Sequence, residues 1–311
     1  MSVDSAIGLK VFYAFVTSVG CVLNVGLFIL LQHFQLSSKL TLILLRIQAI
    51  ADAISCLFST LMCVLKSRQT GDTVTDLITC HLWDSQLFYW ISVVLSTSNL
   101  IWITVDRLWA TVYAATYKLN FHRYLVVSSV ITFIYTASLA IPVSLLVQYR
   151  NGSCIAMSLV TTEDAFYSNY VHPYVWLIFY YFLPSLVMLG VHFRIIFFMR
   201  RLIRKSNTII PAVQQQEQRI MRSFTICTYG FAVSLFAAHA YGTFYYVVET
   251  TNTLFYEPGS PNQLLSVFLT TLNSCINPVI LILTLPSLRQ KSKELFCSCW
   301  RRSTKKPEAG E

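Results

Sequence analysis

The chain has 311 residues, of which 55% are hydrophobic and 12% are charged. Soluble domains contain about 25% charged residues, so a chain with about half of that share is expected to lie in lipid. Its net charge of +9 does not require nucleic acid as a partner, because basic residues beside apolar segments suit the anionic surface of a membrane.

Seven segments are long and nearly free of charge. A helix needs about 20 mostly apolar residues to cross a bilayer. In chain order the segments cover residues 11–32, 47–65, 85–105, 124–149, 165–193, 223–248 and 258–288, and the second alone contains a charged residue, Asp52. Backbone groups in lipid must bond within the protein, which favours helices, and the short alternating segments of a β-barrel are absent. We therefore predict an all-α membrane protein with a seven-transmembrane helix bundle at residues 11–288.

The basic residues indicate the orientation. If the N-terminus is outside, the exterior holds 4 of the 23 Lys and Arg residues, and the other 19 lie on the opposite side. Because Lys and Arg concentrate on the cytoplasmic side, residues 1–10 are expected to be extracellular, without a cleaved signal peptide. Residues 289–311 are expected to be a cytoplasmic tail that begins with a short amphipathic helix. The predicted location is the plasma membrane.

The nine cysteines divide by depth. Five lie inside the spans, where a thiol behaves as a small apolar group. Cys80 and Cys154 lie outside in an oxidising compartment, so we predict that they form a disulfide. Asn151 begins a glycosylation sequon in the same exterior loop. Cys297 and Cys299 follow the last span and are predicted palmitoylation sites.

Polar residues inside the spans carry a resemblance to a known family. They are Asn24, Asp52, the triplet Asp106-Arg107-Leu108, Pro184, and the motif from Asn273 to Asn277-Pro278. In this order the chain, over residues 10–300, resembles the rhodopsin-like (class A) G-protein-coupled receptors. The resemblance implies a receptor, and not an enzyme, that binds an extracellular ligand and activates a heterotrimeric G protein.

Several positions depart from the family pattern and indicate a divergent member. Leu108 and Leu281 replace two customary Tyr residues, and residues 231–238 lack the usual Trp and Pro of the sixth span. The fourth span also lacks its Trp. Cys80 lies two residues further from Arg107 than the family spacing, which predicts an extra turn or bulge between them.

The resemblance assigns the signalling switch to Asp106, Arg107, Glu217, Asn277 and Pro278. The Arg107 guanidinium is always charged and needs partners at the inner membrane edge. Asp106 is expected to hold it at rest, and an Arg107–Glu217 ion pair would join the third span to the sixth. The alternative is that Glu217 is merely solvated within its Gln-rich segment.

The resemblance also implies a sodium site. Asp52, Ser96, Asn273, Ser274 and Asn277 would supply the oxygen atoms that a hard cation prefers. The alternative is a hydrogen-bonded network, with water or with a protonated Asp52. No other cofactor is expected.

The ligand site is expected between the outer halves of the third, fifth, sixth and seventh spans. Tyr89 stands where amine receptors carry Asp, and Thr271 stands where opsins carry the retinal Lys, so neither ligand is favoured. The candidate contacts are Gln86, Tyr89, Trp90, His172, Trp176, Tyr180, His239, Tyr245, Glu249 and Gln263. Each has an alternative role in packing.

The charges of the exterior favour one class of ligand. Eight acidic residues oppose four basic ones there, and an acidic mouth concentrates cations. We therefore predict a short basic neuropeptide. The alternatives are another small chemosensory ligand, or a receptor-like protein with impaired signalling. A retinal-dependent pump is not favoured without a Lys in the last span, and the six scattered histidines do not suggest a metalloenzyme.

Overall fold

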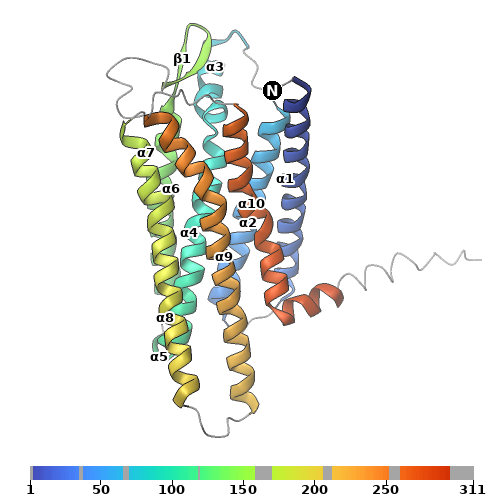
Figure 1. Ribbon diagram of the computed structural model, residues 1–311, viewed down its shortest axis with the longest axis vertical. Coiled ribbons are helices and arrows are strands. Elements are labelled where there is room, and N and C mark those ends of the chain that lie inside the picture. The colour runs from blue at the N-terminus through green and yellow to red at the C-terminus, as the bar shows by residue number, and fades with distance from the viewer. Residues whose placement is uncertain are drawn as a thin grey trace, which may run out of the picture.

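The computed structural model describes residues 3–34, 38–65, 70–117, 120–157, 170–205, 212–251 and 260–294, with side chains for all of these except 3–6, 202–205, 212–218, 220 and 249–251. Within this part of the chain, seven helices are long and apolar enough to cross a membrane. They lie side by side in one bundle (Figure 1). They contain α1 (Val3–Gln32), α2 (Lys39–Val64), α4 (Leu87–Val112), α6 (Phe121–Ala140), α8 (Leu183–Lys205), α9 (Ala212–Thr251) and α10 (Pro261–Thr284). The predicted seven-helix transmembrane bundle is confirmed.

The outer surface of the bundle is apolar and its interior is partly polar. Phe15, Phe133 and Phe193 are exposed, which suits contact with lipid and not with water. One interior cluster of buried side chains includes Leu31, Leu44 and Leu281, and a second includes Trp176 and Val267. These clusters hold the helices together around the polar groups described below.

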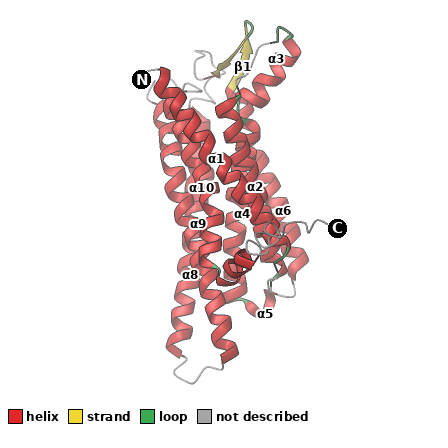
Figure 2. Ribbon diagram, turned by 90° about the vertical axis from the view of Figure 1, so that its right-hand side faces the viewer, coloured by secondary structure: helices red, strands yellow, loops and turns green. Residues whose placement is uncertain are grey.

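Two helices are longer than the charge pattern predicted. α1 begins at Val3, so residues 3–10 continue the first helix beyond the segment that the absence of charge predicted. α9 has 40 residues, which corresponds to a length of about 60 Å and exceeds the roughly 30 Å of the hydrocarbon layer. Figure 2 shows α8 and α9 extending past the other helices at one end. Charged residues end the part of a helix that lies in lipid, but they do not end the helix.

The third span is interrupted where the sequence predicted an extra turn. α3 (Thr73–Thr79) passes into a π-helical turn at Cys80–Asp84, and α4 begins only at Leu87. Gln86, between them, has a φ of 61°, a left-handed conformation that few residues other than Gly adopt. Asp72 caps α3 by accepting a hydrogen bond from the Thr75 backbone N–H at 3.0 Å. Hydrogen bonds from the Thr75 hydroxyl and then from its backbone N–H lower the pKa of Asp72. The predicted extra turn or bulge between Cys80 and Arg107 is confirmed.

A β-hairpin lies over one end of the bundle. β1 (Val147–Arg150) pairs antiparallel with β2 (Ser153–Ala156), with Tyr149 opposite Cys154. The turn residues Asn151 and Gly152 have φ values of 51° and 77°, as a two-residue hairpin turn requires. The absence of charge predicted that residues 147–149 continue the fourth helix, but they form part of β1 instead. We call this end the hairpin end.

The opposite end carries the short helix α5 (Ala114–Tyr117), and we call it the α5 end. After α10 the chain turns at Leu285 into a further helix at residues 286–294. Leu288 of this helix is fully buried, whereas Lys291 and Glu294 are exposed and form an ion pair at 3.3 Å. The predicted amphipathic helix after the last span is confirmed.

Candidate functional site

A cavity of about 90 Å³ lies inside the bundle at the hairpin end. Six of the ten predicted ligand contacts line it: Gln86, Trp90, His172, Trp176, Tyr180 and Gln263. Sequence reasoning missed Asp84, Gly242, Thr243, Tyr246, Ser266 and Thr270, together with Val147 and Ala156 of the hairpin. Five of these residues repeat at helical spacing along α9 and α10, so only the rotation of each helix reveals them. At Gly242 a Cβ atom would lie 2.6 Å from the Ser266 hydroxyl, so α9 and α10 approach closely here.

Five aromatic side chains form part of the cavity wall: Trp90, His172, Trp176, Tyr180 and Tyr246. Trp176 stacks on Tyr180 with ring centroids 4.4 Å apart, and Trp90 meets Trp176 edge-on at 5.1 Å. His172 shares a hydrogen bond of 2.7 Å with the Tyr246 hydroxyl. Among the described residues, the Tyr180 hydroxyl and the Thr243 hydroxyl are buried without a hydrogen-bond partner. Such a wall suits an apolar or aromatic group that also offers hydrogen bonds.

Four predicted contacts lie elsewhere or cannot be placed. Tyr89 is buried behind the wall, where its hydroxyl donates to the Val267 carbonyl at 3.1 Å and lies 3.0 Å from the Thr271 hydroxyl. His239 is also buried and stacks against Tyr180 at 5.2 Å, outside the cavity lining. Tyr245 stacks on Tyr241, and the residue that reaches the cavity is its neighbour Tyr246. The side chain of Glu249 lies outside the described part of the structure.

A polar network surrounds Asp52 between the two ends of the bundle. Asp52 is fully buried, and its Oδ1 accepts hydrogen bonds from the hydroxyls of Ser96 at 2.6 Å and Ser274 at 2.8 Å. Its Oδ2 accepts from the amide nitrogens of Asn277 at 2.8 Å and Gln48 at 3.0 Å. The network thus joins α2, α4 and α10.

The Asp52 network differs from the predicted one by two residues. Asn273, which was predicted to take part, keeps a buried amide oxygen with no partner among the described residues. Gln48, which was not predicted, contacts both Asp52 and Ser96. Sequence reasoning selected charged groups and family positions, and a neutral Gln gave no such signal.

A second polar network lies at the α5 end around Arg107. The Arg107 guanidinium forms an ion pair with the neighbouring Asp106 and donates to the Thr41 hydroxyl. It also lies over the Phe224 ring of α9, 4.8 Å from the ring centroid. The predicted partner Glu217 is part of α9, but its side chain lies outside the described residues. The contact through which Arg107 reaches the sixth span in the described structure is therefore a cation–π interaction.

Tyr117 of α5 completes this network and was missed by sequence reasoning. Its hydroxyl donates to Asp106 Oδ1 at 2.6 Å and lies 2.5 Å from the Ser38 hydroxyl at the start of α2. Burial and the Asp106 carboxylate raise the pKa of Tyr117 to about 12, so the hydroxyl keeps its proton at cellular pH. Tyr117 thereby joins the loop after α4 to the charged pair.

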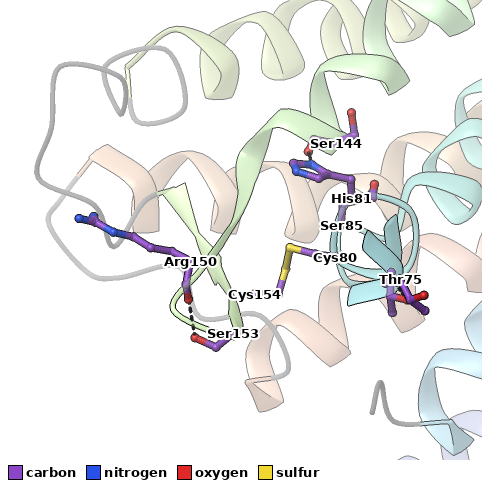
Figure 3. Close-up of a disulfide and its surroundings, with 9 residues drawn as sticks. Thr75, Cys80, His81, Ser85, Ser144, Arg150, Ser153 and Cys154 are labelled. Atoms are coloured by element: carbon purple, nitrogen blue, oxygen red, sulfur yellow. Dashed lines mark hydrogen bonds between the residues drawn. A yellow bond between two sulfur atoms is a disulfide. The ribbon is translucent and has the colours of Figure 1, made fainter. Parts of the chain in front are cut away.

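The hairpin is fixed to the bundle by a covalent bond. Cys80 at the π-helical turn and Cys154 of β2 form a disulfide with their Cα atoms 5.5 Å apart (Figure 3). In the same region Asp76 is buried and accepts hydrogen bonds from Thr70 and Gly71 and from the Tyr149 hydroxyl. Asn151 stands exposed on the hairpin turn, where a glycan has room. The predicted palmitoylation sites Cys297 and Cys299 lie outside the described residues.

The family of the chain follows from comparison with known protein families. Residues 21–281 match the family described as 7 transmembrane receptor (rhodopsin family). A search of curated proteins finds no matching relative. The matched range contains both polar networks, the disulfide and the cavity.

Proposed function

Since the chain belongs to the rhodopsin family of seven-transmembrane receptors, we propose that it binds an extracellular ligand at the hairpin end and activates a heterotrimeric G protein at the α5 end. One observation carries the proposal: the same bundle holds a cavity at one end and a buried, charged Arg107 at the other. Between the two lies the Asp52 network, which connects three of the helices. This arrangement suits a protein in which a ligand at one end shifts the packing of helices at the other.

Two features support an extracellular hairpin end in the plasma membrane. The Cys80–Cys154 disulfide requires an oxidising compartment. Among the described residues, Lys10 and Arg150 lie toward the hairpin end. The basic residues toward the α5 end include Lys39, Arg46, Arg123, Arg194, Arg200, Arg201, Arg219, Arg222, Arg289, Lys291 and Lys293. This distribution follows the preference of basic residues for the cytoplasmic side. On this proposal Arg107 faces the G protein.

The proposed ligand is a short basic neuropeptide that inserts one side chain into the cavity. Asp84 places a carboxylate in the cavity wall, which favours a cationic group nearby. Asp72 and Asp76 lie toward the same end, and both accept hydrogen bonds from the protein itself. Five other acidic residues were predicted to lie on the exterior. Glu163, Asp164 and Glu257 lie outside the described residues, as do the side chains of Asp4 and Glu249.

The size of the cavity favours a second candidate, a small chemosensory ligand. A cavity of about 150 Å³ binds benzene, and the cavity here is smaller, about 90 Å³. It admits one ring-sized group at most, so the remainder of a peptide would have to lie above it. A small molecule with one apolar ring and a hydrogen-bonding group would fit the cavity and would need no part lying above it.

Filling the cavity tests where the ligand binds. We expect Thr243→Trp to lower the potency of any activating ligand by about tenfold or more, because an indole placed in a close-packed site costs about 1–3 kcal/mol or excludes the ligand outright. The matched control is Phe244→Trp, one residue further along α9, where the side chain is 48% exposed to the lipid face. The measurement is a dose–response screen of amidated peptides and small molecules on cells that express the chain with a promiscuous G protein. A response equally strong in wild type and Thr243→Trp would contradict the cavity as the binding site.

Loss of the Tyr117 hydroxyl is expected to raise ligand-independent signalling. Tyr117→Phe removes the hydrogen bond to Asp106 that helps to hold the Arg107 pair at rest. Hydrogen bonds to charged groups stabilise a state by about 1.5–3 kcal/mol, so basal signalling should rise by about tenfold or more. Tyr113→Phe is the control, since Tyr113 is 51% exposed just before α5. Unchanged basal signalling in a Tyr117→Phe receptor with normal surface expression would show that the bond does not restrain the resting state.

A further inference from the structure

The Gln48 side chain lies where a sodium ion beside Asp52 would have to bind, between an Asp52 oxygen atom and the Ser96 oxygen atom. Its Nε2 atom lies 3.0 Å from Asp52 Oδ2 and 2.7 Å from the Ser96 hydroxyl. Both oxygens belong to the residues that the family resemblance assigned to sodium. We propose that the Gln48 amide replaces the cation in this chain, and that the Asp52 site therefore does not bind sodium.

Hydrogen bonds fix which end of the Gln48 amide faces Asp52. The Oε1 atom of Gln48 accepts a hydrogen bond of 2.9 Å from Asn99 Nδ2, which also donates to the Leu44 carbonyl at 2.8 Å. An amide of Asn or Gln has a donating and an accepting end, and its neighbours decide the orientation. With its oxygen held by Asn99, Gln48 can turn only its N–H groups toward Asp52. Asn99 therefore acts as a positioning residue for Gln48.

The carboxylate has no unoccupied acceptor site for a cation. A carboxylate offers about four lone-pair sites, and here each Asp52 oxygen accepts two hydrogen bonds. The donors are Ser96 and Ser274 on Oδ1, and Gln48 and Asn277 on Oδ2. Sodium at this place would have to displace the Gln48 amide and break its bonds to Asp52, Ser96 and Asn99 together. Gln48 and Asp52 lie four residues apart on α2, so the helix itself keeps them on one face.

Two remaining oxygen atoms do not require a cation. The amide oxygens of Asn273 and Asn277 are buried without partners among the described residues. A neutral amide oxygen accepts a hydrogen bond from water, and buried waters commonly satisfy such groups. Without a free carboxylate lone pair nearby, these oxygens alone supply no negative charge to offset a sodium ion. The residues present therefore do not fit the ion that the family resemblance implies.

Thermal unfolding of the purified full-length receptor in NaCl, KCl and choline chloride at equal ionic strength tests the inference. The free thiols of Cys56 and Cys227 are buried, so a thiol-reactive fluorescent dye reports unfolding. We expect the same unfolding temperature for the wild type in all three salts. Gln48→Leu removes the amide and leaves Asp52 open, so sodium alone should then raise the unfolding temperature by about 2–4 °C. Adding Asp52→Asn to Gln48→Leu should abolish that rise.

Two results would overturn the inference. One is a sodium-specific rise in the wild type that Asp52→Asn removes. The other is a folded Gln48→Leu receptor that does not distinguish sodium from potassium. If Gln48→Leu does not fold, Gln48→Glu serves instead, measured at a pH high enough that the two carboxyls do not share a proton, because two ionised carboxylates favour a bound cation. A folded Gln48→Glu receptor that is equally stable in sodium and choline would also count against it. These measurements need no ligand, so their outcome is separate from that of the proposed function.

Discussion

Replacement of Arg107 by Ala is expected to abolish G-protein activation in a receptor that still binds its ligand. Arg107 lies at the α5 end, where it pairs with Asp106 and contacts the Phe224 ring of α9. The ligand cavity lies at the other end, and Arg107 is not part of its lining. Arg107→Ala therefore leaves no positive charge at this position, while the cavity keeps its shape.

The measurement compares ligand binding and second-messenger production in the same cells, at matched surface expression. Arg107→Lys is the control, because it keeps the charge but loses the planar fork that Asp106 and Thr41 accept together. We expect Arg107→Lys to retain part of the signal and Arg107→Ala to retain none. Wild-type signalling by Arg107→Ala would show that the α5-end network does not transmit activation.

Loss of the disulfide is expected to have the largest effect on stability. In Cys154→Ser the cross-link that closes a loop with a sequence separation of 74 is absent. Removal of a native disulfide costs about 2–5 kcal/mol, and the chain-entropy estimate for a loop of this length is about 4 kcal/mol. The hairpin residues Val147 and Ala156 also line the cavity, so the ligand should bind more weakly as well.

Surface expression and thermal unfolding of Cys154→Ser and Cys80→Ser measure this effect. Cys63→Ser is the matched control, because Cys63 is a free, partly buried thiol in α2. Both disulfide variants should be lost from the surface or unfold at clearly lower temperature, and Cys63→Ser should match the wild type. A stable, ligand-binding Cys154→Ser receptor would contradict a structural role for the hairpin attachment.

The helices and the charged pair could be predicted because lipid makes their signals strong. An uncharged run of about 20 residues has few alternatives to a spanning helix. Adjacent Asp106 and Arg107 at the end of such a run have few partners other than each other, and the structure pairs them. The insertion after Cys80 was also predictable, because the distance to Arg107 exceeded the family spacing.

The neutral parts of the site could not be predicted in the same way. Gln48 carries no charge, so nothing in the composition of its span distinguished it from a packing residue. Thr243 and Ser266 line the cavity only because of the rotation of α9 and α10, and Tyr246 reaches it where Tyr245 was predicted. Tyr117 lies in a four-residue helix, and only the folded loop brings it to Asp106. The hairpin had a signal in Asn151-Gly152, but the absence of charge at 147–149 outweighed it.

Nucleotide exchange on a purified heterotrimeric G protein tests the central claim most directly. The wild-type receptor is reconstituted in lipid discs with the G protein, and a ligand found in the cell screen is added. The proposed function predicts that the ligand accelerates exchange severalfold over the G protein alone, and that Arg107→Ala removes the acceleration. A ligand that binds the wild type in the cavity but leaves exchange at the rate of the G protein alone would contradict the proposal. That result would identify a receptor-like protein that binds without signalling.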